Sequence, residues 1–343
     1  MVLRLVGLGL GPPDYMTFKA MKALEASEVV YLDSYTSPLP GELVEFLRSR
    51  LGERLRHATR ADLEDKAVSL VEMAAGVNVA VAVIGDPLVA TTHITLLAEA
   101  ASRGVEFEVV YGVSSISAAI GASCLSSYRF GRTTTVPREA SGESLKTIYR
   151  NVEENLEAGL HTLLLLDVAG DGLSASEAVE RLLAVGAEMG GRFKPDSLVV
   201  VLARLGYGDE LRAACRASQV KSLHLPPPPH TVIIPAQLRS YEKEAIAKLM
   251  KAGEELLAAK EAVSSRRVRA ERYLAKASGA LARLKVVSGD AETRRVLEIA
   301  SSYLEDARFF LNSQMLDDAL IAVSYAEGLL DSLRILGKVE FSW

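Results

Sequence analysis

Over the first third of the chain, short β-branched apolar runs alternate with longer segments whose apolar residues recur at helical spacing. The runs that predict strands cover residues 2–8, 29–32, 77–84 and 106–111, and the segments that predict helices cover residues 17–27, 41–51, 62–75 and 91–102. Strands and helices that alternate along a chain favour a parallel sheet with helices on its faces. We therefore expect a parallel-sheet α/β domain over residues 1–112.

The pattern changes over residues 113–249, which contain more polar and loop-forming sequence. Small residues at 114–121 predict the start of a helix, and residues 175–185 predict another. The same region contains three apolar runs that predict strands, at residues 162–167, 197–203 and 231–235. Together these elements predict a second α/β domain with a mixed sheet.

Residues 250–343 are expected to form an all-α C-terminal extension, because no strand pattern follows about residue 242. Good helix formers fill residues 241–284, and two more helices are predicted over residues 291–311 and 316–336. The last helix has an apolar face, which predicts a helical hairpin or a three-helix unit. This face comprises Leu316, Ala319, Leu320, Val323, Ala326, Leu330 and Leu333.

Length and charge exclude several classes of protein. A chain of 343 residues suggests two or three domains, and a net charge of −5 does not indicate a nucleic-acid or anionic-membrane partner. No apolar run approaches roughly 20 residues, the length of a membrane-spanning helix. The first apolar run is broken too early, at Gly7, for a signal peptide. One basic run is interpreted as a solvated helix face, with a nucleic-acid contact as the alternative; it contains Lys260, Arg266, Arg267, Arg269, Arg272 and Lys276.

Cysteine and histidine are both sparse and dispersed. Cys124 and Cys215 form no metal or redox motif, so each is expected to be a small buried apolar residue, and their scarcity is typical of the reducing cytoplasm. Metal-binding helices often carry two histidines four residues apart, and no pair here has that spacing, so we expect no metal site. The five histidines are His57, His93, His161, His224 and His230.

The turn Gly85-Asp86-Pro87 is the strongest indication of a ligand site. Gly85 permits a sharp turn and Pro87 fixes its own φ, which leaves Asp86 at the carboxyl end of a buried strand. Open α/β sheets bind small ligands at that edge. An alternative is that Asp86 only caps the next helix, since aspartate is a common N-cap residue.

The loop from Gly7 to Pro13 is a second candidate ligand site, and we call it the glycine loop because it has glycines at positions 7, 9 and 11. A dinucleotide-binding loop needs a third glycine where Pro12 lies, followed directly by a helix. Here the prolines delay the helix until about Thr17, so we do not expect a nicotinamide or flavin site, although Asp33 lies near the position of the usual acidic residue. The glycines fit a tight loop that a ligand can approach closely, or a plain connection between strand and helix.

These features occur together in one known family. The chain resembles the diphthine synthases over about residues 1–245, whereas the Gly-Asp-Pro turn alone is shared with the wider tetrapyrrole-methylase superfamily. The similar segments are 7–10 with Asp14 and Thr17, 33–37, 85–93, 115–116, 128–131, 160–167, 199–206 and 227–230. Segments 302–307 and 322–328 resemble a small archaeal helical domain of unknown function, so the chain is interpreted as a fusion.

The resemblance implies a class III methyltransferase of two α/β domains, usually a homodimer, that binds S-adenosylmethionine between the domains and releases S-adenosylhomocysteine. It implies translation elongation factor 2 as the protein substrate. The enzyme would repeatedly methylate the amino group of an aminocarboxypropyl-histidine to form diphthine. The cofactor contacts carried over from the family are Leu10, Asp86, Val89, Ser115, Ile116, Leu166, Leu205 and His230.

Several roles stay open within this resemblance. The segment at 113–116 departs from the family's pattern, so Ser114 is an alternative to Ser115. We expect Asp86 to hold the ammonium or the ribose of the cofactor, and His230 to be a cleft wall, with a general base as the alternative. Residues 91–93 are expected only to start the next helix. No residue is assigned as a catalytic acid or base.

Two other functions compete with diphthine formation. One is methylation of a corrin-type tetrapyrrole, which the segments specific to the diphthine enzymes disfavour. The other is a non-catalytic adaptor that recruits partners through the helical extension. The intact Gly-Asp-Pro turn and glycine loop do not suggest a decayed cleft.

Overall fold

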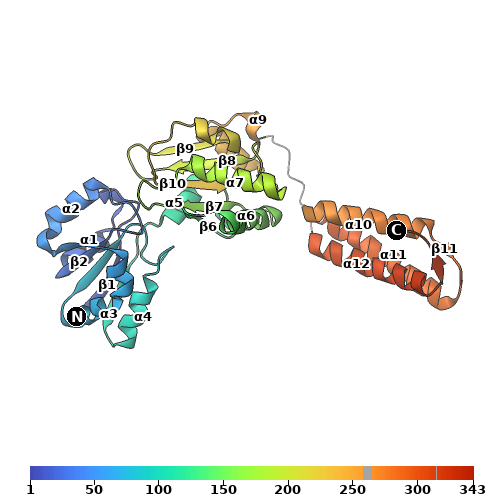
Figure 1. The fold of residues 1–343 in the computed structure, drawn as a ribbon, viewed down its shortest axis with the longest axis horizontal. Helices are drawn as coiled ribbons and strands as arrows, with labels where there is room; N and C mark the ends of the chain where they lie inside the picture. The colour runs from blue at the N-terminus through green and yellow to red at the C-terminus, as the bar shows by residue number, and fades with distance from the viewer. Residues whose placement is uncertain (258–264, 314) are drawn as a thin grey trace. The chain divides into compact units, whose positions relative to one another are not determined.

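The computed structural model describes residues 1–257, 265–313 and 315–343. The described residues form two compact units, one on each side of the gap at 258–264 (Figure 1). The first unit contains two five-stranded sheets with their helices, and the second is built mainly from three helices. Each unit has its own hydrophobic core.

The first sheet is entirely parallel, as predicted, with the strand order β3-β2-β4-β1-β5. The central strand β4 is buried at every position, which explains its unbroken apolar sequence. The edge strand β3 was not predicted because two of its four residues, Arg56 and His57, are polar and exposed. The strands are β1 (Val2–Gly7), β2 (Val29–Asp33), β3 (Leu55–Ala58), β4 (Val79–Val83) and β5 (Glu106–Val110).

Helices cover both faces of this sheet (Figure 1). The apolar side chains of α1 and α2 pack on one face, and those of α3 and α4 pack on the other. Thr17 caps α1 by accepting a hydrogen bond from the backbone N–H of Ala20 at 3.0 Å. The elements are η1 (Pro13–Tyr15), α1 (Phe18–Glu25), α2 (Gly41–Leu51), η2 (Gly52–Arg54), η3 (Ala61–Asp65), α3 (Ala67–Gly76) and α4 (Ile94–Ser102).

Two of these helices begin later than predicted. The segment expected to be helical over residues 62–75 starts with the π-helical turn η3, and α3 begins only at Ala67. The helix expected over residues 91–102 begins at Ile94, because the hydroxyl groups before it bond elsewhere. Thr91 donates to the carbonyl of Pro87 at 2.5 Å, and Thr92 donates to Glu64 at 2.8 Å.

The second sheet is mixed, as predicted, with the strand order β6-β7-β10-β8-β9. Strands β6 and β7 are parallel and the other pairs are antiparallel. The edge strands β6 and β9 were not predicted, since the first has three residues and the second carries arginines at positions 212 and 216. The strands are β6 (Thr134–Val136), β7 (Thr162–Leu166), β8 (Leu198–Ala203), β9 (Leu211–Arg216) and β10 (His230–Ile234).

Helix α6 was missed as well, although Leu145, Ile148 and Val152 lie at helical spacing on its buried face. Helix α7 extends four residues beyond the predicted end at 185 before it stops at Gly190, which has a left-handed backbone. The elements around the second sheet are α5 (Ser115–Ala122), η4 (Ser127–Arg129), α6 (Gly142–Glu157), α7 (Ala175–Met189), η5 (Ala217–Ser222), α8 (Ser240–Leu249) and α9 (Glu254–Leu257).

The second unit confirms the predicted helical extension but corrects one detail. A short antiparallel pair, β11 (Lys285–Val286) with β12 (Val339–Glu340), lies where no strand was expected. The predicted apolar face of the last helix is buried or half-buried in the core. The helices are α10 (Ser265–Arg283), α11 (Ala291–Asn312) and α12 (Leu316–Ile335); residues 258–264 of the predicted helical stretch lie outside the described residues.

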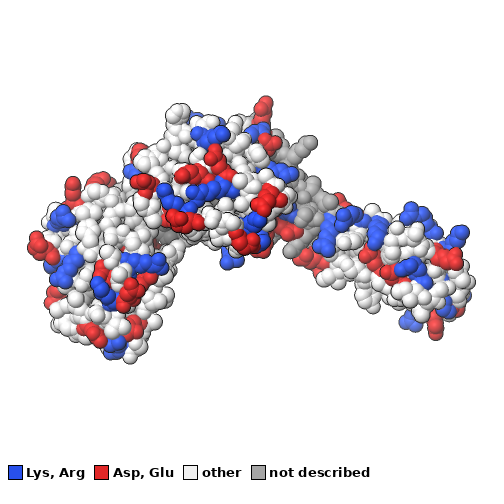
Figure 2. Space-filling model, viewed as in Figure 1, with Lys and Arg blue, Asp and Glu red and all other residues white. Residues whose placement is uncertain are grey.

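Charged side chains of both signs are interspersed on the visible face of each unit (Figure 2). In the basic run of α10, Arg267 pairs with Glu271 at 2.9 Å, and the guanidinium groups of Arg269 and Arg272 lie over the ring of Tyr273. These contacts within one helix are typical of a solvated helix face. Lys260 and the side chain of Arg266 lie outside the described residues.

The described part of the chain has no helix that combines the length and apolarity needed to cross a bilayer. Both cysteines are free thiols. Cys215 is buried as expected, whereas Cys124 is only half-buried, which corrects that expectation. Cys124 lies just after α5 with φ at 64°, and this turn keeps part of its side chain near the surface.

Three glycine backbones meet at the carboxyl edge of the first sheet. Gly7 ends β1, Gly85 follows β4 and Gly112 follows β5. A Cβ atom placed on Gly7 would lie 2.6 Å from the nitrogen of Gly112 and 2.7 Å from the carbonyl oxygen of Gly85. A Cβ atom on Gly112 would collide with that same oxygen. Gly7 and Gly112 must therefore lack a side chain for the strand ends to converge, and Gly85 has φ at 82°, a conformation that favours glycine. We call this contact the glycine junction.

A buried carboxylate, Glu242 of α8, joins several segments around the second sheet. It pairs with Arg129 at 2.8 Å and accepts backbone N–H bonds from Ser126 at 2.9 Å and Arg239 at 2.7 Å. His161 lies 3.2 Å from the same carboxylate, and its other ring nitrogen accepts the N–H of Ala236, so it donates its own proton to Glu242. Every oxygen of this fully buried group is therefore partnered.

We predict that Gly112→Ala destabilises the protein by about 1–3 kcal/mol, because a methyl group overpacks the glycine junction. Chemical denaturation of the two proteins measures the difference. Gly121→Ala is the matched control: it lies in α5 with nothing within 4 Å of the added carbon, and alanine is the better helix former by roughly 1 kcal/mol. A Gly112→Ala protein as stable as wild type would contradict the close approach of the strand ends.

We predict that Glu242→Gln lowers the free energy of unfolding by about 3 kcal/mol at pH 7, because Arg129 loses its buried partner. Burial alone raises the pKa of Glu242, but the N–H groups of Arg239 and Ser126, together with His161, hold it below its ordinary value of 4.5. The stabilisation is therefore present above pH 4.5 and disappears as the pH falls through the lowered pKa.

Urea denaturation of this variant and wild type from pH 7 to pH 3 tests both statements. The control is Glu244→Gln, which removes an exposed carboxylate of the same helix that pairs only with Lys248. Its effect should stay below about 0.5 kcal/mol. A difference between Glu242→Gln and wild type that grows on acidification would refute the sign.

Candidate functional site

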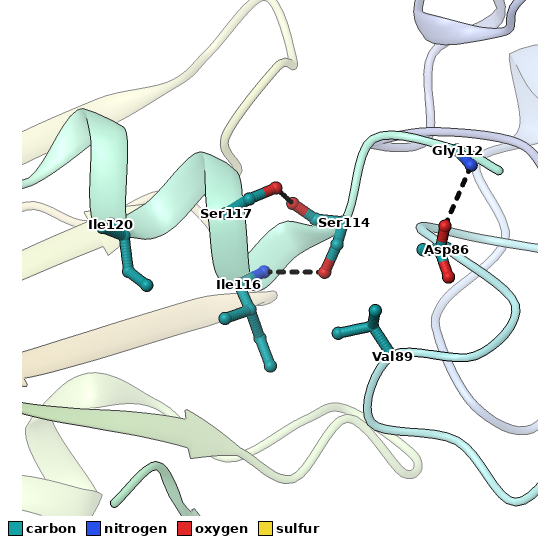
Figure 3. Close-up of a pocket in the computed structure, with 7 residues that line it drawn as sticks. All are labelled: Asp86, Val89, Gly112, Ser114, Ile116, Ser117 and Ile120. Carbon is teal, nitrogen blue, oxygen red and sulfur yellow. Dashed lines mark hydrogen bonds between the residues drawn. The ribbon is translucent and has the colours of Figure 1, made fainter. Parts of the chain in front are cut away.

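A cavity of about 340 Å³ opens beside the glycine junction (Figure 3). Three segments form it: the loop after β4, the short connection between β5 and α5, and the first turns of α5. Its walls are mostly apolar, with one carboxylate and two hydroxyl groups. The lining residues are Asp86, Val89, Gly112, Ser114, Ile116, Ser117 and Ile120.

Asp86 holds two of these segments together. One carboxylate oxygen accepts the N–H of Leu88 at 2.9 Å, and the other accepts the N–H of Gly112 at 3.2 Å (Figure 3). Asp86 does not cap the following helix, because α4 begins at Ile94 and its N-cap residue is His93. A carboxylate oxygen has two lone pairs, so both oxygens of Asp86 can still accept a bond from a ligand.

Ser114 lines the cavity, whereas Ser115 is exposed and does not. The hydroxyl oxygen of Ser114 accepts the N–H of Ile116 at 3.2 Å and so caps α5, and Ser117 donates to the carbonyl of Ser114 at 2.9 Å (Figure 3). Of these two serines, Ser114 is therefore the one placed to meet a ligand in this cavity. Ile116 and Ile120 are one helical turn apart and share a face of α5, which extends the apolar wall.

The remaining predicted residues lie elsewhere. Leu10 packs against the β8–β9 loop, where a Cβ atom on Gly206 would lie 3.0 Å from the Cβ of Leu10. Leu205 precedes Gly206 in that loop and is half-buried, and Leu166 is buried in the core of the second sheet. The structure thus brings Asp86, Val89 and Ile116 together in the cavity, whereas Leu10 contacts Gly206 and Leu205 packs against a hydrophobic core.

His230 is buried at the start of β10, with both ring nitrogens engaged. Its Nδ1 accepts the N–H of Ala175 at 3.1 Å, so its Nε2 carries the proton and donates to the carbonyl of Pro226 at 2.7 Å. Burial lowers the pKa of His230 below 6.5, so the ring is neutral at pH 7. These bonds favour the structural interpretation of His230 over the general base.

A second buried imidazole, that of His93, lies at the end of the loop that carries Asp86. His93 is 1 % exposed, and its Nε2 lies 3.5 Å from the fully buried carboxylate of Asp33. Asp33 also accepts the N–H groups of Tyr35 at 2.9 Å and Thr36 at 3.2 Å. Asp33 is therefore used inside its own loop and cannot reach the ribose of a dinucleotide. Burial lowers the pKa of His93 as well.

Sequence reasoning missed Gly112, Ser117 and Ile120 as cavity residues. Gly112 was placed only as a domain end, although a glycine directly after a predicted strand is itself a signal of close backbone approach. Ser117 and Ile120 follow Ile116 by one and four residues, so helical periodicity could have placed Ile120. Within the described ranges, no three His, Cys, Asp or Glu side chains gather in a way that could hold a metal ion.

Comparisons with known proteins assign this architecture to a family. Residues 2–221 match the profile of the tetrapyrrole (corrin/porphyrin) methylases, and residues 271–339 match a protein family of unknown function, DUF357. The chain is 38% identical to a diphthine synthase of Methanopyrus kandleri over 259 residues, which is 72% of this chain and 95% of the relative. It is 39% identical to a diphthine synthase of Pyrobaculum calidifontis over 250 residues, which is 71% of this chain and 97% of the relative.

A solved structure agrees with the sequence relatives. The crystal structure of a diphthine synthase superposes with a TM-score of 0.68 at 32% identity and covers 75% of this chain and 99% of its own. The part matched by these relatives ends before the helical extension, so the predicted fusion is confirmed by two separate family matches. The chain is a methyltransferase that belongs to the diphthine synthase family, with a DUF357 domain at its C-terminus.

Proposed function

We propose that this enzyme uses S-adenosylmethionine to methylate the amino group of the aminocarboxypropyl-histidine of translation elongation factor 2, repeatedly, so that diphthine forms. The observation that carries the proposal is the near-complete coverage of relatives named diphthine synthase, 95% and 97% of their lengths. The cavity at the carboxyl edge of the first sheet supports it, because α/β sheets bind small ligands there.

The cavity residues fit S-adenosylmethionine. A volume of about 340 Å³ lies within the usual range of ligand pockets, roughly 300–1,000 Å³. Val89, Ile116 and Ile120 provide apolar walls for an adenine ring or a methionine chain, and Gly112 exposes backbone. Asp86 supplies the negative charge that an ammonium group or a ribose hydroxyl would contact. We assign Leu10, Ser114, Leu166, Leu205 and His230 to the surroundings of this site, with backbone contacts where their side chains are buried.

The reaction makes few demands on side-chain chemistry. When bound, S-adenosylmethionine supplies a methyl group activated by a sulfonium, so the amine nitrogen forms the new C–N bond while the C–S bond breaks. The protein must hold the acceptor in line and keep its amine neutral. A free alkylamine has a pKa near 10, and burial lowers it. Both ring nitrogens of His230 are engaged, so we take water as the acceptor of the proton that the methylated ammonium must lose before the next transfer.

The family resemblance also leads us to propose a cytoplasmic homodimer with elongation factor 2 as its protein partner. Methylation of a tetrapyrrole is the remaining enzymatic alternative, and the adaptor is the non-enzymatic one. Neither is favoured by the relatives, which are named diphthine synthases over nearly their whole length.

We predict that the enzyme adds methyl masses to elongation factor 2 that carries the aminocarboxypropyl-histidine. Intact mass spectrometry after incubation with S-adenosylmethionine measures the gain. The control is the same factor with the modified histidine replaced, which should gain nothing. Absence of methyl masses despite measured binding of S-adenosylmethionine would contradict the substrate and redirect the search to tetrapyrroles.

We predict that Asp86→Asn weakens the binding of S-adenosylmethionine about tenfold or more, since a bond to a charged partner is lost. The amide keeps one oxygen for a backbone N–H, but its NH2 group faces the other N–H, so we also expect a loss of stability of about 1–3 kcal/mol with the fold retained. Isothermal titration calorimetry measures the affinity, and thermal unfolding checks the fold.

Glu106→Gln is the matched control for Asp86→Asn, because it removes an exposed carboxylate at the opposite, amino end of β5. Its affinity for S-adenosylmethionine should equal that of wild type. A folded Asp86→Ala protein that binds the cofactor as tightly as wild type would rule out the role of Asp86.

A further inference from the structure

A second cavity, of about 380 Å³, lies between the start of α2 and the β8–β9 loop. Unlike the first cavity, it is lined by a cation, an anion and an aromatic ring in addition to prolines. None of the residues assigned above to the cofactor lines it. Its walls are Pro38, Leu39, Pro40, Gly41, Glu42, Arg204, Tyr207, Pro228 and Pro229.

Arg204 is held in one position within this cavity. Its backbone has φ at 52°, an uncommon left-handed conformation for arginine, and its N–H donates to the carbonyl of Pro229 at 2.9 Å. The guanidinium carbon lies 4.2 Å from the ring centroid of Tyr207, and Nε donates to Asp209 at 2.6 Å. Among the residues that the structure describes, neither terminal nitrogen of Arg204 has a hydrogen-bond partner.

A fixed guanidinium with two unused terminal nitrogens matches the geometry of a carboxylate. Arginine binds carboxylates through two parallel N–H···O bonds, and stacking on an aromatic ring limits the orientations of its planar group. Tyr207 provides this ring, and Asp209 bonds Nε and so leaves the terminal nitrogens available. The side chain of Arg204 is only 23% exposed, which strengthens such a bond relative to one in open water.

The glycine loop connects this cavity to the first one. Gly9 exchanges backbone hydrogen bonds with Gly85, directly before Asp86. Gly11 packs on the second cavity, where a Cβ atom would lie 2.6 Å from the hydroxyl oxygen of Tyr207 and 3.2 Å from Pro40. Gly9 and Gly11 are two residues apart, so at most about 7 Å of chain separates the two contacts.

We propose that the second cavity binds the α-carboxylate of the aminocarboxypropyl group of the substrate, with Arg204 as the carboxylate-binding residue. This inference rests on the proposed function, whose acceptor carries its amine and its carboxylate on the same carbon. A carboxylate bound by Arg204 places that amine beside the glycine loop, whose Gly9 bonds to Gly85, the residue before Asp86 of the first cavity. The second cavity then selects the modified histidine over a plain histidine or a lysine, neither of which has this carboxylate.

The test is steady-state kinetics of Arg204→Gln and Arg204→Lys with elongation factor 2 that carries the aminocarboxypropyl-histidine. We expect KM for the modified factor to rise about tenfold or more in Arg204→Gln, because a bond between charged groups is lost. Arg204→Lys keeps the charge but cannot form the bidentate bond, so its KM should rise less. The Kd for S-adenosylmethionine, measured by calorimetry, and the unfolding midpoint should equal those of wild type.

Arg212→Gln is the matched control, since Arg212 lies on the adjacent strand β9, pairs with Glu210 and does not line the cavity. It should keep the wild-type KM. A folded Arg204→Gln protein with the wild-type KM overturns this inference while leaving the proposed function intact. A wild-type enzyme that binds S-adenosylmethionine but methylates no modified factor overturns both.

Discussion

The close approach of Gly7, Gly85 and Gly112 is the constraint on which the site depends. These residues end or follow β1, β4 and β5, which are neighbours in the parallel sheet. Because Gly7 and Gly112 have no side chains, the strand ends converge until Asp86 can accept the N–H of Gly112. From Gly112 the chain passes directly to Ser114 and α5, so the same junction positions the far wall of the cavity.

The polar groups around the cavity are largely committed to holding loops. Asp86 joins two strand ends, Ser114 caps α5, and Asp33 holds its own loop through the N–H groups of Tyr35 and Thr36. His230 uses both nitrogens in the same way. Burial lowers the pKa of His93 and His230, so neither adds positive charge near the site at pH 7. A site built in this way orients reactants, which is sufficient for transfer from an activated methyl donor.

The sequence allowed the parallel sheet, the mixed sheet and the helical extension to be predicted because their central strands and packed helices have clear periodicity. Edge strands such as β3 and β9 were missed, since exposed arginines and a histidine interrupt their apolar pattern. The Gly-Asp-Pro turn located Asp86, but Gly112 and Ile120 join it only through the pairing of β5 with β1 and the direction of α5. Local sequence can mark Gly112 as a point of close approach and Ile120 as a neighbour of Ile116, but it does not say which distant segment each one meets.

The glycine loop has a further consequence for how two ligands can meet. Gly9 and Gly11 have φ at 77° and 122°, conformations that residues with side chains rarely adopt, so the loop can be tight only with glycine at these positions. The loop is thin because it has no side chains at these positions: Gly9 contacts Gly85, and Gly11 contacts Tyr207. Methyl transfer requires reacting atoms about 3–3.5 Å apart, and a side chain at Gly9 or Gly11 would collide with Tyr15 or Tyr207 and so shift this loop. The loop that fails as a dinucleotide fingerprint therefore has the properties that a shared border between donor and acceptor sites needs.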